Sequence, residues 1–315
     1  GSGCSAAQVV PELAKPEANV RSITQLMRTP PWVEPDTIPP DYIPLYEKWI
    51  PGLMTHVPGL ASSMRKALFI KLEKAFYDIF MDTAWSRRAR PQLEKEYLDN
   101  MRQVAPKEYH EILTPNYSLG CKRRVFCGTW YRSLNAPNVE LTTQPLTSVH
   151  AKSVVLGPGR HYPPLKSEDA DEIREIPADV IIMANGFETN QWLHPLKVIG
   201  RKGKNLEEVW AERGGAQAYQ GIAMDSFPNF FILFGPNTAT GHNSVIFATE
   251  NAVNYSLKFI KPILNGQVSS YEVKEDAERE WTQQVQDALR KSVFHRGTCS
   301  SWYISADGWN SSTYP

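Results

Sequence analysis

The sequence predicts an α/β fold with sites for dinucleotides, and three observations support this prediction. A Gly-x-Gly-x-x-Ala turn opens the chain at Gly1 and leads into a helical pattern. Two strand-like segments, residues 179–184 with the apolar run 180–184 and residues 230–234, each end in a loop that contains glycine. Such runs are typical of buried parallel strands, and ligands of α/β sheets bind at the carboxyl ends of those strands.

The composition of the chain excludes several classes of protein. The chain has 315 residues, of which 42% are hydrophobic, and this length corresponds to about two ordinary domains. The 34 Lys and Arg residues balance the 34 Asp and Glu residues, so there is no electrostatic basis for a nucleic-acid partner. No apolar run approaches the ~18 residues that a transmembrane helix needs. The cysteines lack metal-ligand spacing, so we expect no metal site.

In the first thirty residues, the sequence predicts a helix, then a strand, then the end of the strand at two prolines. Apolar residues between Cys4 and Ala14 fall on one helical face, in which Pro11 removes a backbone donor. Residues 20–27 predict a strand. The strand ends at Arg28-Thr29-Pro30-Pro31, because proline cannot continue the pairing.

The middle of the chain predicts a helical insertion followed by short strands. Apolar residues at helical spacing within residues 41–103 indicate two or three helices. Strand signals follow at residues 124–126, 139–141, 146–149 and 153–156, and a charged stretch, residues 166–175, separates them from the apolar run 179–184. A helix of about twenty residues is expected from near Ser244, and a tail helix carries Ala277, Trp281, Val285, Ala288 and Leu289.

Three segments carry residues suited to chemistry, each with an ordinary structural alternative. The turn at Gly1 allows close approach of a pyrophosphate, although small residues also serve packing. Arg28-Thr29 stands where an NAD site places an acidic residue, and a guanidinium there suits a 2′-phosphate, although the arginine could simply be exposed. The run at residues 122–124 is more often a solvated basic face, and His242 with its neighbouring asparagines suits turns and caps. No HExxH, GxSxG or Walker A motif is present, which removes support for hydrolases and NTPases.

Six segments in order resemble the class B flavoprotein monooxygenases, and within them the Baeyer–Villiger type, particularly fungal members. The segments are residues 1–8, 25–30, 120–124, 179–187, 227–241 and 299–303. The resemblance implies a Rossmann-like flavoprotein with two dinucleotide-binding domains and a helical insertion. It also implies that the first FAD-binding half is missing, because neither the FAD fingerprint nor the F-x-G-x-x-x-H-x-x-x-W motif of the family is present.

The resemblance assigns roles to individual residues. The NADPH pyrophosphate loop would be lined by Gly1, Gly3, Ser5 and Gln8, and the 2′-phosphate would be bound by Arg28, Thr29 and Lys122. Arg123 matches the active-site arginine, whose cation would stabilise a negative flavin peroxide. The linker motif A-T-G of the family reads Ala184-Asn185-Gly186 here. The segment that meets the flavin would contain Asn237, Asn243 and Ser244.

These assignments define an expected organisation and function. Residues 1–40 begin the NADP-binding domain, residues 41–115 form the helical insertion, residues 116–178 complete the NADP-binding domain, and residues 179–315 form the C-terminal part of the FAD-binding domain and tail. The expected activity uses NADPH, FAD and O₂ to insert oxygen beside a ketone carbonyl through a flavin peroxide. The alternatives are oxygenation of a nitrogen or sulfur atom, or a truncated product that binds a nucleotide without catalysis. The expected location is cytoplasmic, although the chain begins at Gly1 and an N-terminal targeting segment is not observable.

Overall fold

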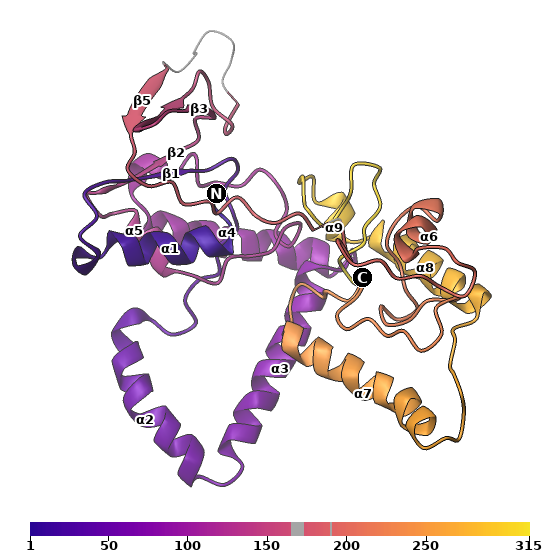
Figure 1. Ribbon diagram of the computed structural model, residues 1–315. Helices are drawn as coiled ribbons and strands as arrows, with labels where there is room; N and C mark the ends of the chain where they lie inside the picture. Colours follow the sequence, from indigo (N-terminus) through magenta and orange to yellow (C-terminus); the bar gives the residue numbers. More distant parts are fainter. Residues whose placement is uncertain (165–172, 190) are drawn as a thin grey trace. The chain divides into compact units, whose positions relative to one another are not determined.

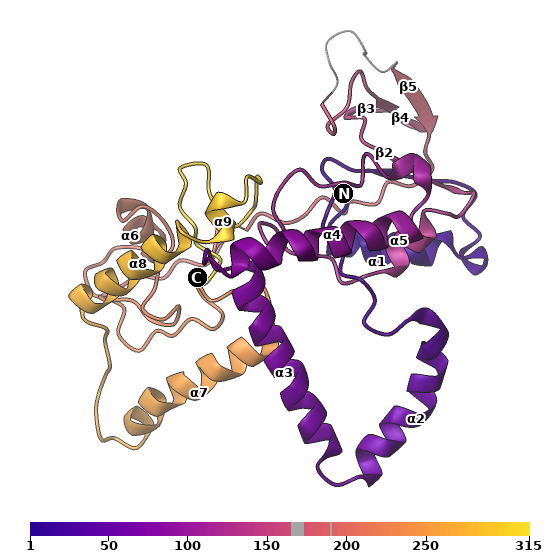
Figure 2. The ribbon, with the colours of Figure 1, turned by 180° about the vertical axis from the view of Figure 1, so that it is seen from behind.

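The computed structural model describes residues 1–164, 173–189 and 191–315, which form two compact units (Figures 1 and 2). The first unit comprises Gly1–Ala61 and Pro91–Phe187, and the second comprises Ser62–Arg90 and Glu188–Pro315. Each unit has its own cluster of buried apolar side chains. Within the described ranges, no helix is long and apolar enough to cross a bilayer.

The first unit is built on a parallel pair of strands covered by helices. Strand β1 (Ile23–Leu26) pairs with β2 (Val139–Thr142), with Ile23 opposite Val139. Helix α1 (Cys4–Ala14) packs against β1 and against α5 (Thr129–Ser133). Apolar residues of α1, β1, β2 and α5 share one core with residues of α4 (Ser86–Val104). The predicted helix has the expected bounds, whereas the predicted strand is shorter than residues 20–27.

A second sheet in this unit is antiparallel. It has the order β3 (Leu146–Val149), β4 (Ser153–Leu156) and β5 (Arg174–Pro177). The first two strands match the predicted ranges. The prediction of a charged separator over residues 166–175 is wrong at its end, because Arg174 and Glu175 pair with β4. Residues 166–172 lie outside the described residues. The charges suit an edge strand, and Arg174 forms an ion pair with Glu140 at 2.7 Å.

The helices predicted within residues 41–103 are confirmed as three long helices, whereas their grouping as an insertion stays a prediction. They are α2 (Ile43–His56), α3 (Leu60–Ile79) and α4, and the short 3₁₀ turns η2 (Pro40–Tyr42) and η3 (Lys107–Tyr109) lie before and after them. A further 3₁₀ turn, η1 (Pro16–Ala18), follows α1. The strand predicted at residues 124–126 is reduced to a single parallel bridge between Val125 and Val33.

The two apolar runs that predicted buried parallel strands are not strands. Val180 and Met183 are each 76% exposed, and Leu233 is 48% exposed. Neither run has a strand partner among the residues that the structure describes. A strand becomes buried only where neighbouring chains satisfy its N–H and C=O groups. The apolar composition of these runs therefore does not lead to burial among the residues that the structure describes.

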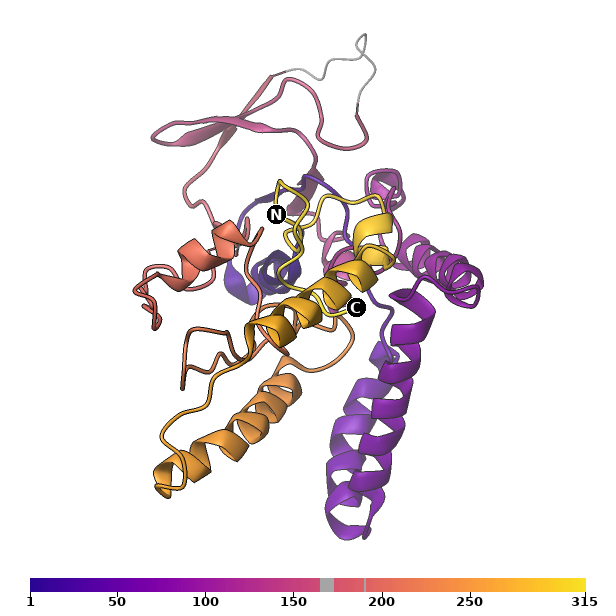
Figure 3. The same cartoon turned by 90° about the vertical axis from the view of Figure 1, so that its right-hand side faces the viewer.

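The second unit consists of helices joined by long loops. Helix α6 (Leu206–Glu212) begins with a capping box between Asn205 and Glu208 and packs into the apolar cluster of this unit. Helices α7 (Val245–Leu264) and α8 (Glu275–Leu289) match the two predicted C-terminal helices and are joined by an extended connection (Figures 1 and 3). A short helix, α9 (Val293–Arg296), follows α8.

A buried ionic network links α6 and α8. Arg213 donates to Asp225 at 2.5 Å and to Glu278 at 2.8 Å, and Glu278 is fully buried. Burial disfavours the charge of Asp225, but the Arg213 guanidinium more than offsets this and holds the pKa of that carboxyl below its usual value. Burial instead raises the pKa of Glu278. One cation therefore balances two carboxyls in the interior of this unit.

Substitution of Arg213 by alanine is expected to destabilise the protein strongly. The change leaves Asp225 and Glu278 buried without their cation, which costs about 3–5 kcal/mol when one partner of a buried ion pair is removed. Urea unfolding followed by circular dichroism measures this loss. The matched control is Arg290→Ala. This change removes an exposed ion pair with Asp287 at the C-terminal end of α8 and should cost less than about 1 kcal/mol. Equal effects of the two substitutions would contradict the prediction.

Candidate functional site

The glycine turn at the start of the chain forms an open helix N-terminus. Gly3 is the N-cap of α1 in an extended conformation, and no side chain caps this end. A Cβ atom at Gly3 would have no neighbour within 4 Å, whereas one at Gly1 would lie 2.1 Å from the carbonyl oxygen of Ala184. Ser5 and Gln8 are exposed on the first turns of the helix. The uncapped N–H groups and the helix dipole favour an anion at this position.

Hydrogen bonds tie this turn to the end of β1. The buried Gln25 side chain donates to the carbonyl of Gly1 at 2.8 Å and accepts from the Trp130 indole at 2.9 Å. The Ser2 hydroxyl donates to the carbonyl of Thr29 at 2.9 Å. The turn is therefore held beside the residues that follow the strand, as a dinucleotide site requires.

Arg28, Thr29 and Lys122 converge, as the sequence predicts. The Lys122 ammonium donates to the Thr29 hydroxyl at 3.1 Å and lies 4.8 Å from the centre of the Tyr117 ring. Burial lowers the pKa of Lys122, and the nearby Arg28 cation lowers it further. Two cations that repel one another at a strand end form a site that a bound phosphate would stabilise.

The two adjacent arginines differ in their environment. Arg123 is exposed, and no ion pair of its guanidinium occurs within the described ranges. Arg124 is buried and forms an ion pair with Glu34 at 2.7 Å. The Arg123 guanidinium is therefore available to a ligand, whereas the charge of Arg124 is neutralised.

The linker residues Asn185 and Gly186 lie next to the glycine turn. Both are exposed, and Gly186 has a φ of +103°, which favours glycine. The ideal Cβ position of Gly1 is 3.7 Å from the Cα of Asn185. The structure thus brings the fourth of the quoted segments to the same place as the first.

Residues of the loop before α7 form hydrogen bonds within the protein, whereas the resemblance predicts that this loop meets the flavin. The side-chain amide of Asn237 donates to the carbonyls of Asn310 and Thr313, at 2.7 and 2.9 Å, and so holds the C-terminal tail. Asn243 donates to Glu73 at 3.2 Å, and Ser244 caps α7 by accepting from the Phe247 N–H group. Both amide hydrogens of Asn237 are used, and a cofactor role for this residue stays a prediction.

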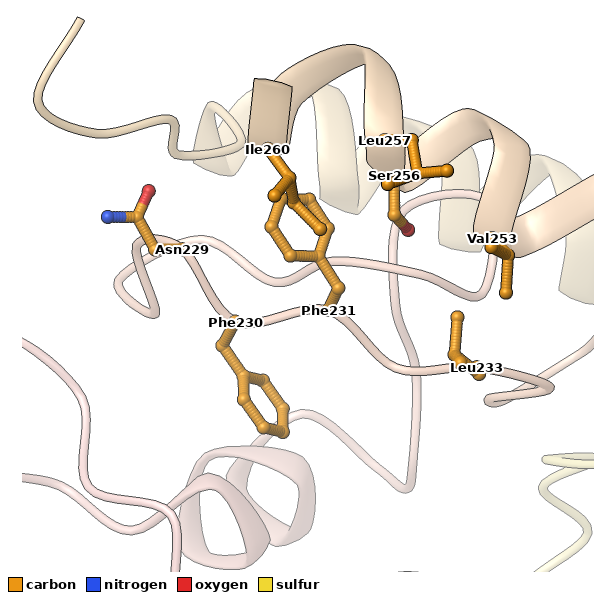
Figure 4. A pocket seen from close by; sticks show the side chains of 8 residues that line it. All are labelled: Asn229, Phe230, Phe231, Leu233, Val253, Ser256, Leu257 and Ile260. Carbon is orange, nitrogen blue, oxygen red and sulfur yellow. The ribbon is translucent and has the colours of Figure 1, made fainter. Parts of the chain in front are cut away.

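An apolar groove lies between α7 and the preceding loop (Figure 4). Its lining residues come from both elements and include no charged group, and Phe231 points toward α7 whereas the Phe230 ring points away from it. The lining residues are Asn229, Phe230, Phe231, Leu233, Val253, Ser256, Leu257 and Ile260. The groove does not have the chemistry of a phosphate site. The described residues also contain no group of three or more His, Cys, Asp or Glu side chains that could hold a metal ion.

Sequence reasoning missed the residues that support the basic segment. Glu34 and Tyr97 contact Arg124, and the Trp32 indole donates to the carbonyl of Tyr117 at 2.9 Å. Glu34 and Tyr97 belong to no recognised motif. Their spacing from Arg124 along the chain, 90 and 27 residues, gives no signal that could reveal these contacts.

Comparison with known proteins places these features in context. No protein-family model matches the chain. A protein of Aspergillus niger named FAD-binding monooxygenase ktnD is 32% identical over all of this chain and 48% of its own length. A Baeyer–Villiger monooxygenase of Pseudomonas aeruginosa is 30% identical over all of this chain and 55% of its own length. The chain is homologous to Baeyer–Villiger monooxygenases.

The fold agrees with this homology. The structure of cyclohexanone monooxygenase from Rhodococcus sp. Phi1, bound to NADP⁺, aligns with a TM-score of 0.69 at 22% identity. The alignment covers 100% of this chain and 61% of that one. The predicted Rossmann-like α/β class is therefore confirmed. The chain spans about half the length of the curated relatives it matches.

Replacement of Arg28 by glutamine is expected to raise the pKa of Lys122. The change removes a cation that lowers this pKa, while the burial of Lys122 is retained. NMR titration of the lysine side chains measures the shift. Arg21→Gln is the matched control, because Arg21 is an exposed arginine before β1, and it should leave the pKa of Lys122 unchanged. A lower or unchanged pKa in Arg28→Gln would argue against the proximity of the two cations.

Proposed function

We propose that this chain supplies the NADPH-binding part, and a portion of the flavin-binding part, of a monooxygenase that inserts one oxygen atom of O₂ beside a ketone carbonyl. The observation that carries this proposal is the convergence of Arg28, Thr29 and Lys122 beside the glycine turn. The names of the relatives support the reaction class. The proposed boundaries are residues 1–40 and 116–178 for the NADP-binding domain, 41–115 for the insertion, and 179–315 for the flavin-binding part and tail.

The residues present fit NADPH well and FAD in part. The uncapped N-terminus of α1 fits the pyrophosphate, because the Cβ side of Gly3 is open and Ser5 and Gln8 lie at the edge of the turn. Gly1 packs closely against the Ala184 carbonyl and would line the loop through its backbone. The pair of cations fits a phosphate on the adenosine ribose. For FAD, the described residues offer the N-terminus of α7 and the loop before it, with Asn237, Asn243 and Ser244, and the linker Asn185-Gly186.

The residues of this chain bind and orient the reactants. Arg28 and Lys122 would form ion pairs with the 2′-phosphate, which NADH lacks, and Thr29 would orient the Lys122 ammonium. Arg123 has an exposed guanidinium in the same segment, and would stabilise negative charge that develops next to the substrate carbonyl. Bound flavin, once reduced, supplies the chemistry with O₂. The substrate is a small molecule, and a cytoplasmic location stays a prediction.

Titration of the purified chain with FAD and NADPH tests the proposal. We expect the purified chain to bind NADPH. A preparation in which the remaining part of the flavin site is also present should be yellow, oxidise NADPH and convert a cyclic ketone to its lactone, measured by absorbance and product analysis. Conversion of a sulfide or amine without conversion of any ketone would favour heteroatom oxygenation. Binding of NADPH without FAD uptake or turnover in that preparation would favour a nucleotide-binding product without catalysis.

Replacement of Arg28 by alanine is expected to weaken the binding of NADPH much more than the binding of NADH. The change removes a charged partner of the 2′-phosphate, which is worth about tenfold or more in affinity when a hydrogen bond to a charged group is lost. Isothermal titration with each nucleotide measures the two affinities. Arg21→Ala provides the control with the same loss of charge. Equal losses for both nucleotides would contradict a 2′-phosphate role.

Replacement of Arg123 by alanine is expected to abolish product formation and leave NADPH binding intact. The guanidinium would act on charge that develops in the transition state, and loss of such a group costs about 100-fold or more in rate. Lactone yield and NADPH affinity are measured on the same FAD-loaded preparation. Normal yield in this variant would overturn the assignment of Arg123.

A further inference from the structure

A partly buried ion pair, between the buried Arg124 and Glu34, lies close in the chain to the proposed phosphate-binding residues. The Arg124 side chain is 4% exposed, and its Nη1 atom donates to Glu34 Oε2 at 2.7 Å and to the Tyr97 hydroxyl at 2.8 Å. The Tyr97 hydroxyl in turn donates to Glu34. Burial raises the pKa of Tyr97, so the phenol keeps the proton that it donates. The three groups form a closed triangle of hydrogen bonds.

The triangle joins three segments that are distant in the chain. Glu34 follows the strand end that carries Arg28 and Thr29, Arg124 belongs to the segment with Lys122, and Tyr97 lies on α4. The two segments also pair through the backbone, since the N–H of Val125 donates to Trp32 at 2.9 Å and the N–H of Glu34 donates to Val125 at 2.9 Å. The ion pair therefore lies at the point where the two cation-bearing segments are aligned.

Helix α4 holds the basic segment at a second point. The Glu94 carboxylate accepts from the Leu119 N–H group at 2.8 Å, one helical turn before Tyr97. The Tyr97 ring also packs edge-on against the Trp32 ring, with centroids 6.0 Å apart. This packing does not depend on the hydroxyl, so the hydroxyl can be removed while the ring keeps its place.

We infer that Tyr97 and Glu34 are positioning residues for the dinucleotide site, which hold Arg124 as a buried anchor so that Lys122 faces Thr29 at the distance that a 2′-phosphate requires. The inference rests on the proposed function. Arg124 lies two residues from Lys122, and an anchored side chain restricts the backbone between them. Neutralisation of Arg124 by Glu34 also confines the free positive charge of this segment to Lys122 and Arg123.

The test compares two nucleotides that differ by the 2′-phosphate. The 315-residue chain and its Tyr97→Phe variant are titrated calorimetrically with adenosine 2′,5′-bisphosphate and with adenosine 5′-monophosphate. Because the hydroxyl acts through one hydrogen-bonded network, we expect the bisphosphate to bind about 2- to 10-fold more weakly, with unchanged affinity for the monophosphate. The Glu34→Gln variant should show the same selective loss, and thermal unfolding checks the fold of each variant.

A matched tyrosine provides the control. The Tyr109 hydroxyl lies in the same unit and accepts from the Leu141 N–H group at 3.4 Å, beside β2 rather than the basic segment. Tyr109→Phe removes the same atom and should leave both affinities unchanged. If Tyr97→Phe or Glu34→Gln binds both nucleotides like the parent chain, or loses both equally, the positioning role is wrong. If the parent chain itself does not prefer the bisphosphate, the proposed 2′-phosphate site fails, and the inference fails with it.

Discussion

The backbone hydrogen bonds between Val125 and the segment after β1 are the constraint on which the proposed cofactor site depends. They place Trp32 and Glu34 beside Val125. The Lys122 ammonium thereby comes within 3.1 Å of the Thr29 hydroxyl, although the two residues are 93 positions apart in the chain. The cations would otherwise separate, because they repel one another. The site is thus stabilised by backbone hydrogen bonds between residues that bind no ligand. The charges of Arg28 and Lys122 remain available to a ligand.

The structure uses buried charge in two ways. In the second unit, Arg213 balances Asp225 and Glu278, and this network joins loops to α8. In the first unit, Glu34 balances Arg124 and leaves Arg123 exposed. Arg123 and Arg124 are adjacent in the sequence but differ in their environment, because Arg124 is buried and paired whereas Arg123 is exposed.

The sequence predicted those features that depend on local chemistry. The bounds of α1, the strands β3 and β4 and the start of α7 followed from periodicity and turn residues. The proximity of Thr29 and Lys122, which are 93 residues apart, was implied by the family resemblance alone. The runs 179–184 and 230–234 were wrong as strands because strand formation requires a partner, and the partner is not a property of the run itself. Tyr97 and Glu34 could not be predicted, since a buried contact between distant segments leaves no local pattern.

The exposed run Val180-Ile181-Ile182-Met183 has a consequence for the handling of the protein. Its four side chains are apolar, three of them are β-branched, and it carries no charge or proline. Its backbone forms no strand pair with the residues that the structure describes. Such a segment is a template for strand addition by a second chain. Concentrated protein should therefore aggregate through this run first. A lysine placed within it would act as a gatekeeper against that association, because a charge is costly to bury between stacked strands.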